Sequence, residues 1–247
     1  MNRSSIEWTD YTWNPVTGCE FGCDYCYGRR MVNENPSMEK YYPNGYDPTY
    51  HPERLNQPLE VKKPSKIFVV DMGDLFGDWV SAEWIQSVID ITNQAPQHIF
   101  QFLTKNPKRY AEFIFPSNCW LGTTVDYANE GYERLLDLTG SISVLRNPHC
   151  LRFGSFEPLM EDVSANPFIK RLDWIIIGKM TGEASKKKQY IKNMASFKEN
   201  ATKLLDLAHT FHQIPTFIKN NAEWTVKIQE FPIYGLDAFD SNQKRLF

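Results

Sequence analysis

The stretch that decides the fold is YTWNPVTGCEFGCDYCY, residues 11–27, where a short β-rich run leads directly into three cysteines. Cys19, Cys23 and Cys26 fall within eight residues at the spacing Cx3Cx2C. The chain has only five cysteines in all, too few and too unevenly placed for a disulfide framework. The cluster therefore indicates a set of metal ligands on the loop that follows the first expected strand.

Further β-rich runs follow along the chain and are separated by stretches with helical spacing. The helical pattern is clearest over residues 81–95, where apolar residues share one face behind Ser81 as a candidate N-cap. Other helical segments are expected from Asn106, over residues 127–138 and from Ser196. Strands that alternate with helices imply right-handed βα units and a parallel sheet. The expected strands are residues 11–16, 66–70, 99–103, 120–125, 150–153, 174–177 and 216–218.

Six or seven such strands favour one α/β domain over residues 1–247, built as a partial or complete (β/α)6–7 barrel of parallel strands, similar to a TIM barrel. Two segments do not fit this repeat. About 33–58 is rich in proline and tyrosine and is expected to form a long ordered loop, and about 219–247 an irregular aromatic tail. Substrate specificity is expected to come from these two segments, above the carboxyl ends of the strands.

Composition excludes several classes of protein. Apolar residues make up 42% of the chain, enough to bury a sizeable core, so disorder is excluded for most of it. The net charge of -3 lacks the global basic field of non-specific nucleic-acid binders, so any nucleic-acid contact should be local. No apolar run approaches a membrane span, and residues 1–10 lack a secretory signal. We therefore expect a cytoplasmic protein whose thiols are free or metal-bound.

Three thiolates on one tight loop can ligate three irons of a [4Fe-4S] cluster and leave the fourth iron open to a cofactor or substrate. A zinc knuckle is an alternative that needs a fourth ligand, for which His51, Cys119 and Cys150 are the candidates. The two later cysteines lie beside apolar neighbours and are otherwise expected to be buried core thiols. A redox pair formed by the last two motif cysteines leaves the first motif cysteine unexplained.

The cysteine spacing, with an aromatic residue before the last cysteine, resembles that of the radical S-adenosylmethionine (radical SAM) superfamily. Residues 22–27 and the pair Thr104-Lys105 are also similar to the spore photoproduct lyase branch, which repairs DNA. Over nearly its whole length the chain resembles the phage-type Gp37/Gp68 family, DUF5131. The segments that carry this resemblance are residues 6–10, 12–19, 25–27, 74–76, 103–105, 121–122, 157–159 and 177–178.

The resemblance implies an enzyme in which Cys19, Cys23 and Cys26 hold a [4Fe-4S] cluster and S-adenosylmethionine (SAM) chelates its open iron. Reductive cleavage of SAM then gives a 5′-deoxyadenosyl radical, which abstracts hydrogen from a substrate. It also implies an electron donor such as flavodoxin or ferredoxin. The phage-type family and the lyase-like motifs favour a nucleotide or nucleic acid as substrate. The alternative is a zinc-binding module that contacts nucleic acid without catalysis.

Polar residues at the ends of the expected strands supply the other site candidates. Gly73 and Asp74 stand where related enzymes bind the SAM amino group, although an aspartate there also suits a turn. Lys105 is a catalytic candidate that could meet a carboxylate or phosphate, although lone lysines at strand ends are commonly solvated. Glu157, a second catalytic candidate, must be paired in its apolar setting. Thr124 and Asp126 are implied cofactor contacts that also suit the N-cap of the next helix. The further cofactor contacts implied are Tyr25, Ser155, Gly178 and Lys179.

Overall fold

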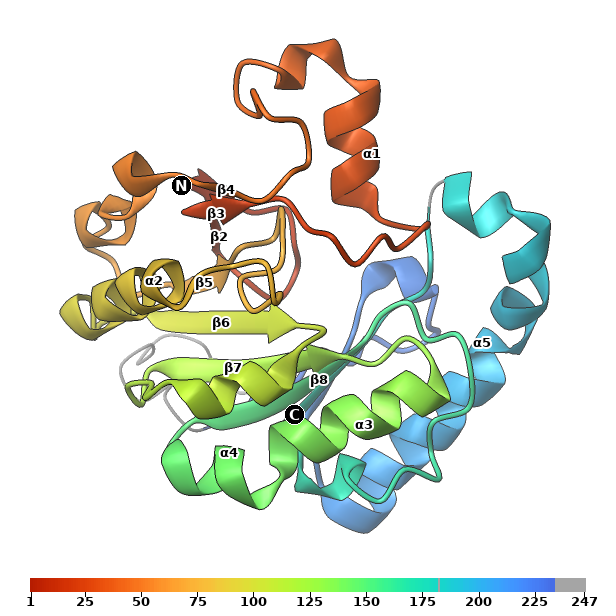
Figure 1. The fold of residues 1–247 in the computed structure, drawn as a ribbon. Coiled ribbons are helices and arrows are strands. Elements are labelled where there is room, and N and C mark those ends of the chain that lie inside the picture. Colours follow the sequence, from red (N-terminus) through yellow and green to blue (C-terminus); the bar gives the residue numbers. More distant parts are fainter. Residues whose placement is uncertain (182, 234–247) are drawn as a thin grey trace.

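The computed structural model describes residues 1–181 and 183–233, and in this part of the chain eight strands form one sheet with helices packed along it (Figure 1). The strand order is β1-β2-β5-β6-β7-β8-β9-β10, and every neighbouring pair is parallel except β1 with β2. The strands are β1 (Asn2–Arg3), β2 (Tyr11–Trp13), β5 (Lys66–Val69), β6 (Ile99–Thr104), β7 (Cys119–Thr124), β8 (Leu151–Phe156), β9 (Trp174–Ile177) and β10 (Thr216–Ile218).

The fold is therefore mixed α/β with a mostly parallel sheet, as the alternation of strand and helix signals predicted. Within the described residues no ladder joins the edge strands β1 and β10, so the complete barrel, one of the two forms expected, is not formed there. A second, two-stranded antiparallel sheet pairs β3 (Val16–Thr17) with β4 (Thr49–Tyr50). It holds the segment after β2 against the long insertion.

The two faces of the main sheet are both buried, which explains why its strands read as nearly continuous apolar runs. Alternate residues such as Ile67 and Val69 pack into the core beneath the helices, while Phe68 belongs to an aromatic cluster on the opposite face. Trp8 covers that second face from the amino-terminal segment, with its ring centroid 4.7 Å from that of Phe68. Phe231 stacks on Trp174 at 5.4 Å. The helices are α1 (Tyr27–Glu34), α2 (Ala82–Gln94), α3 (Ala128–Thr139), α4 (Ser141–Arg146) and α5 (Lys188–Asp206).

Local chemistry fixes where the helices begin. Ser81 is the N-cap of α2, as expected, and its hydroxyl accepts a hydrogen bond from Trp84 N at 3.3 Å. The helical segment expected from Asn106 is the short 3-10 helix η4 (Pro107–Glu112), in which the buried Arg109 donates to two carbonyl oxygens of the loop after β5. Helix α5 begins at Lys188, well before the expected Ser196. None of the helices in residues 1–181 and 183–233 is long and apolar enough to cross a membrane.

The insertion expected at about 33–58 packs against β2 and β3. It contains β4 and two 3-10 helices, η1 (Pro36–Met38) and η2 (Pro52–Arg54), and it ends within a third, η3 (Gln57–Glu60). Its anchor is Trp13, whose indole nitrogen donates to Arg54 O at 2.8 Å. The remaining short helices are η5 (Ile169–Arg171), η6 (Glu183–Lys186), η8 (Asn220–Ala222) and the π-helical turn η7 (Leu207–His212).

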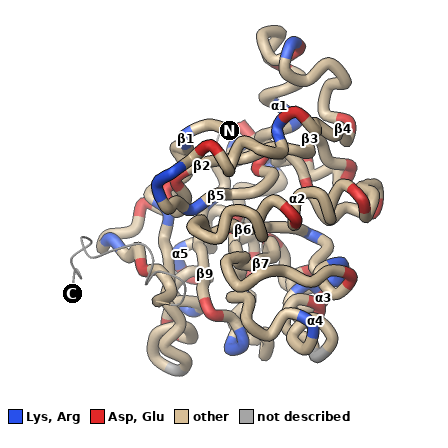
Figure 2. Tube along the Cα trace, turned by 90° about the vertical axis from the view of Figure 1, so that its left-hand side faces the viewer, with Lys and Arg blue, Asp and Glu red and all other residues tan. Residues whose placement is uncertain are grey.

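The tail expected from about residue 219 contacts both ends of the sheet. Lys219 and Asn221 lie at the carboxyl ends of the strands, beside Glu157. Glu230 and Phe231 lie at the opposite end, where Glu230 O accepts a hydrogen bond from the Trp174 indole at 2.8 Å. The first part of the tail thus lies at the carboxyl ends of the strands, residues 230–231 pack at the amino end, and residues 234–247 lie outside the described part. Acidic and basic residues are interspersed over the trace (Figure 2), in keeping with the small net charge.

Candidate active site

A cavity of about 410 Å³ opens at the carboxyl ends of the parallel strands. The residues that follow β5, β6, β8 and β9 contribute Asp71, Lys105, Glu157 and Lys179 to its wall, and β7 contributes Thr124. All three motif cysteines line the same cavity. Its volume lies in the range of small-molecule sites, roughly 300–1,000 Å³. The carboxyl edge of the sheet therefore gathers most of the candidates that the sequence placed at strand ends.

The cysteine loop, residues 18–26, runs from β3 to α1 and is shaped by two glycines. Gly18 and Gly22 have φ angles of +87° and +67°, a region that favours glycine. A Cβ atom on Gly18 would lie 2.3 Å from a backbone oxygen of the insertion, so no larger residue fits there. At the other end, the sulfur of Cys26 caps α1 and accepts a hydrogen bond from Arg29 N at 3.4 Å. The loop is therefore fixed by backbone geometry at Gly18 and by a side-chain cap at Cys26.

The three thiols are free and half-buried. Burial raises the pKa of the Cys19 thiol to about 12, so this group is a neutral thiol at physiological pH. A bound metal would require its deprotonation. Across the described ranges, no three His, Cys, Asp or Glu side chains converge closely enough to hold a metal ion. The loop thus arranges three thiols around one cavity without closing a coordination shell.

The three residues expected as a fourth zinc ligand all lie away from the cavity. Cys119 and Cys150 are buried core thiols, as expected, and Cys119 contacts the Thr92 hydroxyl beneath α2 at 3.5 Å. His51 is buried beside β3. None of these three candidates for a fourth zinc ligand is among the residues that line the cavity. The structure therefore does not bring any of the three expected fourth zinc ligands to the motif cysteines.

Asp126 is the centre of a buried charge cluster directly after β7. Its Oδ1 accepts a hydrogen bond from Arg134 Nη1 at 2.6 Å, and its Oδ2 accepts from both Lys105 Nζ and the Tyr25 hydroxyl. Lys105 Nζ also donates to the Tyr25 hydroxyl at 2.6 Å. Burial alone would raise the pKa of Asp126, but the Lys105 ammonium and the Arg134 guanidinium hold this pKa at about 2. One carboxylate thus pairs with two cations, of which Lys105 lines the cavity.

Asp74 also lines the cavity, but its two oxygens are committed to the protein. It accepts hydrogen bonds from the Thr104 hydroxyl at 2.6 Å and from Lys105 N at 2.9 Å. It also accepts one from Phe76 N, within its own loop, at 3.0 Å. Burial raises the pKa of this carboxyl. Gly73 lies against the cysteine loop, where a Cβ would come within 2.6 Å of Gly18 O. Asp74 therefore ties the end of β5 to the end of β6, and its bond within its own loop is of the kind that a turn residue makes.

Glu157 is paired, as its apolar setting required. Lys219 Nζ donates to Glu157 Oε1, and Asn221 Nδ2 lies 3.5 Å from the same oxygen. A Cβ on Gly178 would lie 2.8 Å from the Glu157 carboxyl carbon, so the glycine allows this side chain to lie against β9. Asn221 also accepts a hydrogen bond from Lys179 N at 3.3 Å. The ends of β8, β9 and β10 are thereby joined in one polar wall.

Three of the expected cofactor contacts, Asp126, Ser155 and Gly178, are not among the residues lining the cavity. The sequence reasoning missed Asp71, Arg134 and Lys219. Asp71 lines the cavity, accepts a hydrogen bond from Asn14 Nδ2 at 2.7 Å and has a pKa raised by burial. The strand-end rule used for the other candidates would have found Asp71 and Lys219, which follow β5 and β10. Arg134 lies within α3 and carries no such signal.

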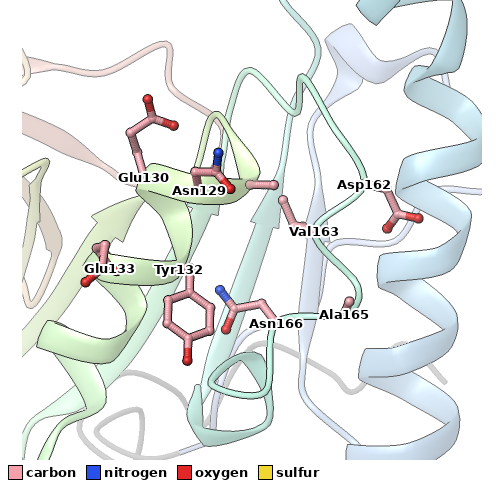
Figure 3. A pocket seen from close by; sticks show the side chains of 9 residues that line it. Asn129, Glu130, Tyr132, Glu133, Asp162, Val163, Ala165 and Asn166 are labelled. Carbon is pink, nitrogen blue, oxygen red and sulfur yellow. The ribbon is translucent and has the colours of Figure 1, made fainter.

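A separate depression of about 560 Å³ lies between α3 and residues 162–166 (Figure 3). Glu130 and Glu133 stand on its α3 side, and Tyr132 and Asn166 lie beside each other within it. Its lining contains none of the site residues expected from the sequence. Its described lining offers carboxylates but neither a thiol nor a cation, in contrast to the cavity lined by the motif cysteines.

Fold and site together define a mixed α/β protein with a thiol-lined cavity at the carboxyl ends of a mostly parallel sheet. The chain belongs to the family described as "Protein of unknown function (DUF5131)", which matches residues 3–236. This match confirms the resemblance to that family and includes the cysteine loop and the strands from β2 to β10. No curated protein and no solved structure matches the chain.

Proposed function

We propose that this protein is a radical SAM enzyme that holds a [4Fe-4S] cluster on Cys19, Cys23 and Cys26. The observation that carries the proposal is that all three thiols line one cavity at the carboxyl ends of the strands, whereas the other two cysteines are buried in the core. The open, mostly parallel sheet supports a partial barrel as the scaffold. When bound, the cluster and SAM supply a 5′-deoxyadenosyl radical that abstracts hydrogen from the substrate.

The protein's own residues bind and orient the cofactor and the substrate. Lys105 lines the cavity and shares the single carboxylate of Asp126 with Arg134. Because one negative charge does not neutralise two cations, the Lys105 ammonium can also bind a carboxylate or phosphate. Thr124 and Lys179 add a hydroxyl and an amine to the same cavity. Glu157, fixed by Lys219, offers a carboxylate oxygen to an amino or hydroxyl group. The cavity therefore suits a ligand that carries both positive and negative groups, as SAM does.

A nucleotide or nucleic acid is the substrate class that we propose. Phe21 and Tyr27 line the cavity and are partly exposed, with 38% and 54% of their surface accessible. Arg30 lines it as well. Aromatic faces next to a cation are the features that bind unpaired nucleobases and their phosphates. We also propose that a flavodoxin or ferredoxin supplies the electron and that the enzyme works in the reducing cytoplasm.

Anaerobic reconstitution with iron and sulfide tests the proposal. We expect about four irons per chain, visible absorbance typical of a cluster, and 5′-deoxyadenosine after addition of SAM and dithionite. Cys23→Ala should abolish all three signals. Cys150→Ala is the matched control, because this thiol lies outside the cavity, and it should retain them.

Folded protein that binds no iron and releases no 5′-deoxyadenosine would overturn the proposal. About one zinc per chain without iron, in protein purified without oxygen, would instead favour the zinc-binding module.

A further inference from the structure

The two residues between the second and third motif cysteines are both held by distant parts of the chain. Asp24 binds the start of α5: its carboxylate accepts hydrogen bonds from Gln189 Nε2 at 2.6 Å and from the Tyr190 hydroxyl. Its backbone oxygen accepts a hydrogen bond from Lys187 Nζ at 3.0 Å. The cysteine loop and the start of α5 accordingly lie side by side in Figure 1, although they are more than 160 residues apart in sequence.

Tyr25 makes the second connection, to the ends of β6 and β7. Its hydroxyl donates to Asp126 and accepts from Lys105 Nζ at 2.6 Å. The Lys105 ammonium also lies over the Tyr25 ring, 5.1 Å from its centroid. Consecutive loop residues are therefore tied to different parts of the fold, Asp24 to the start of α5 and Tyr25 to the ends of β6 and β7.

We infer that Asp24 and Tyr25 are positioning residues, which hold Cys23 and Cys26 at the cavity before a metal arrives. The inference rests on the proposed function only where it names the metal of an iron–sulfur cluster as what these thiols bind. The loop needs such support because Gly22, immediately before Cys23, has a φ of +67° and no side chain to pack. A site held in place by contacts outside the ligands loses less entropy when its metal binds.

The two connections differ in strength. The Asp126 side chain is 3% exposed, so the hydrogen bond from Tyr25 forms in a dry, charged setting. Asp24 is exposed, so water and salt weaken its bonds to α5. Loss of the Tyr25 hydroxyl should therefore loosen the loop more than loss of the Tyr190 hydroxyl.

Alkylation of the metal-free protein by iodoacetamide, followed site by site by mass spectrometry, tests the inference. The rate is compared at its high-pH plateau, so that a change in thiol pKa does not enter. Tyr25→Phe should raise the rates of Cys23 and Cys26 about tenfold, as expected for loss of one hydrogen bond to a charged group. Tyr190→Phe should raise them about threefold.

Two controls separate positioning from general destabilisation. Tyr41→Phe removes the hydroxyl of a tyrosine that is 53% exposed, and it should change neither rate. Cys150 serves as the internal reference in every variant, and its rate and the thermal unfolding midpoint should stay constant. In reconstituted protein, an iron chelator should extract iron faster from Tyr25→Phe than from the unmodified chain.

The outcomes distinguish this inference from the proposed function. Faster alkylation of Cys23 and Cys26 in both variants, in a chain that binds no iron, would support the positioning role and overturn the proposed enzyme. Unchanged rates in Tyr25→Phe and Tyr190→Phe, in a chain that binds its cluster, would overturn the positioning role alone. If Tyr25→Phe does not fold, Tyr190→Phe decides by itself, and an unchanged rate there overturns the inference.

Discussion

Replacing Asp126 by asparagine tests the charge cluster that supports the site. The substitution keeps the size of the side chain but removes the negative charge shared by Lys105 and Arg134. The pKa of Asp126 lies at about 2, against 3.8 for an ordinary aspartate, which corresponds to about 2.5 kcal/mol of stabilisation. The two cations left without a counter-charge add to the loss, because breaking a buried pair costs roughly 3–5 kcal/mol. We therefore expect the free energy of unfolding at pH 7 to fall by about 3–5 kcal/mol.

The same cluster sets a pH dependence with a definite sign. The pKa of Asp126 is lower in the folded chain than in the unfolded chain, so its contribution is complete above about pH 4 and is lost as the pH falls through 2. Urea unfolding, followed by the fluorescence of the seven tryptophans, measures both quantities. The difference between Asp126→Asn and the unmodified chain should shrink between pH 4 and pH 2.

Asp162→Asn is the matched control, because Asp162 pairs with Lys203 at 3.0 Å on the surface. Its loss should cost less than about 1 kcal/mol. The explanation of the charge cluster would be refuted by equal stability of Asp126→Asn and the unmodified chain at pH 7. A difference that persists unchanged to pH 2 would refute it as well.

Three further predictions concern other parts of the site. Gly18→Ala forces a Cβ to within 2.3 Å of a backbone oxygen, at a residue with a positive φ. It should therefore lower the free energy of unfolding by about 2 kcal/mol or more. An unchanged thermal unfolding midpoint would contradict this. Lys219→Met removes the partner of Glu157. If the proposed SAM site includes Glu157, the SAM affinity measured by calorimetry should fall about tenfold. An unchanged affinity would exclude the polar wall at the ends of β8, β9 and β10 from the binding site. In the metal-free protein, Cys19 has a pKa of about 12, so its alkylation rate should rise about tenfold per pH unit from pH 8 to pH 11. A plateau near pH 9 would show that this thiol is not buried as described.

The sequence predicted the strands and their alternation with helices well, because buried parallel strands have a simple apolar pattern. It did not predict how the sheet ends, because closure depends on whether the two edge strands meet. The antiparallel β1 and the short β10 form those edges in the described residues. Nor did local pattern predict the contacts of Arg109 in η4, which donates to carbonyl oxygens some thirty residues away.

In the site, the sequence predicted residues whose position in the chain carries the signal. The cysteine motif gave the thiols, and strand ends gave Lys105 and Glu157. What it could not give is which charges pair, because Lys219 meets Glu157 across 62 residues and Tyr25 meets Asp126 across 101. Those pairings are set by the order of strands in the sheet, which no local pattern encodes.

The most direct test of the proposed enzyme is electron paramagnetic resonance of the anaerobically reconstituted and reduced protein, with and without SAM. If Cys19, Cys23 and Cys26 hold a cluster with one open iron, the reduced protein shows a cluster signal, and added SAM changes its g-values. A folded protein that shows no cluster signal, or whose signal is identical with and without SAM, would contradict the proposal.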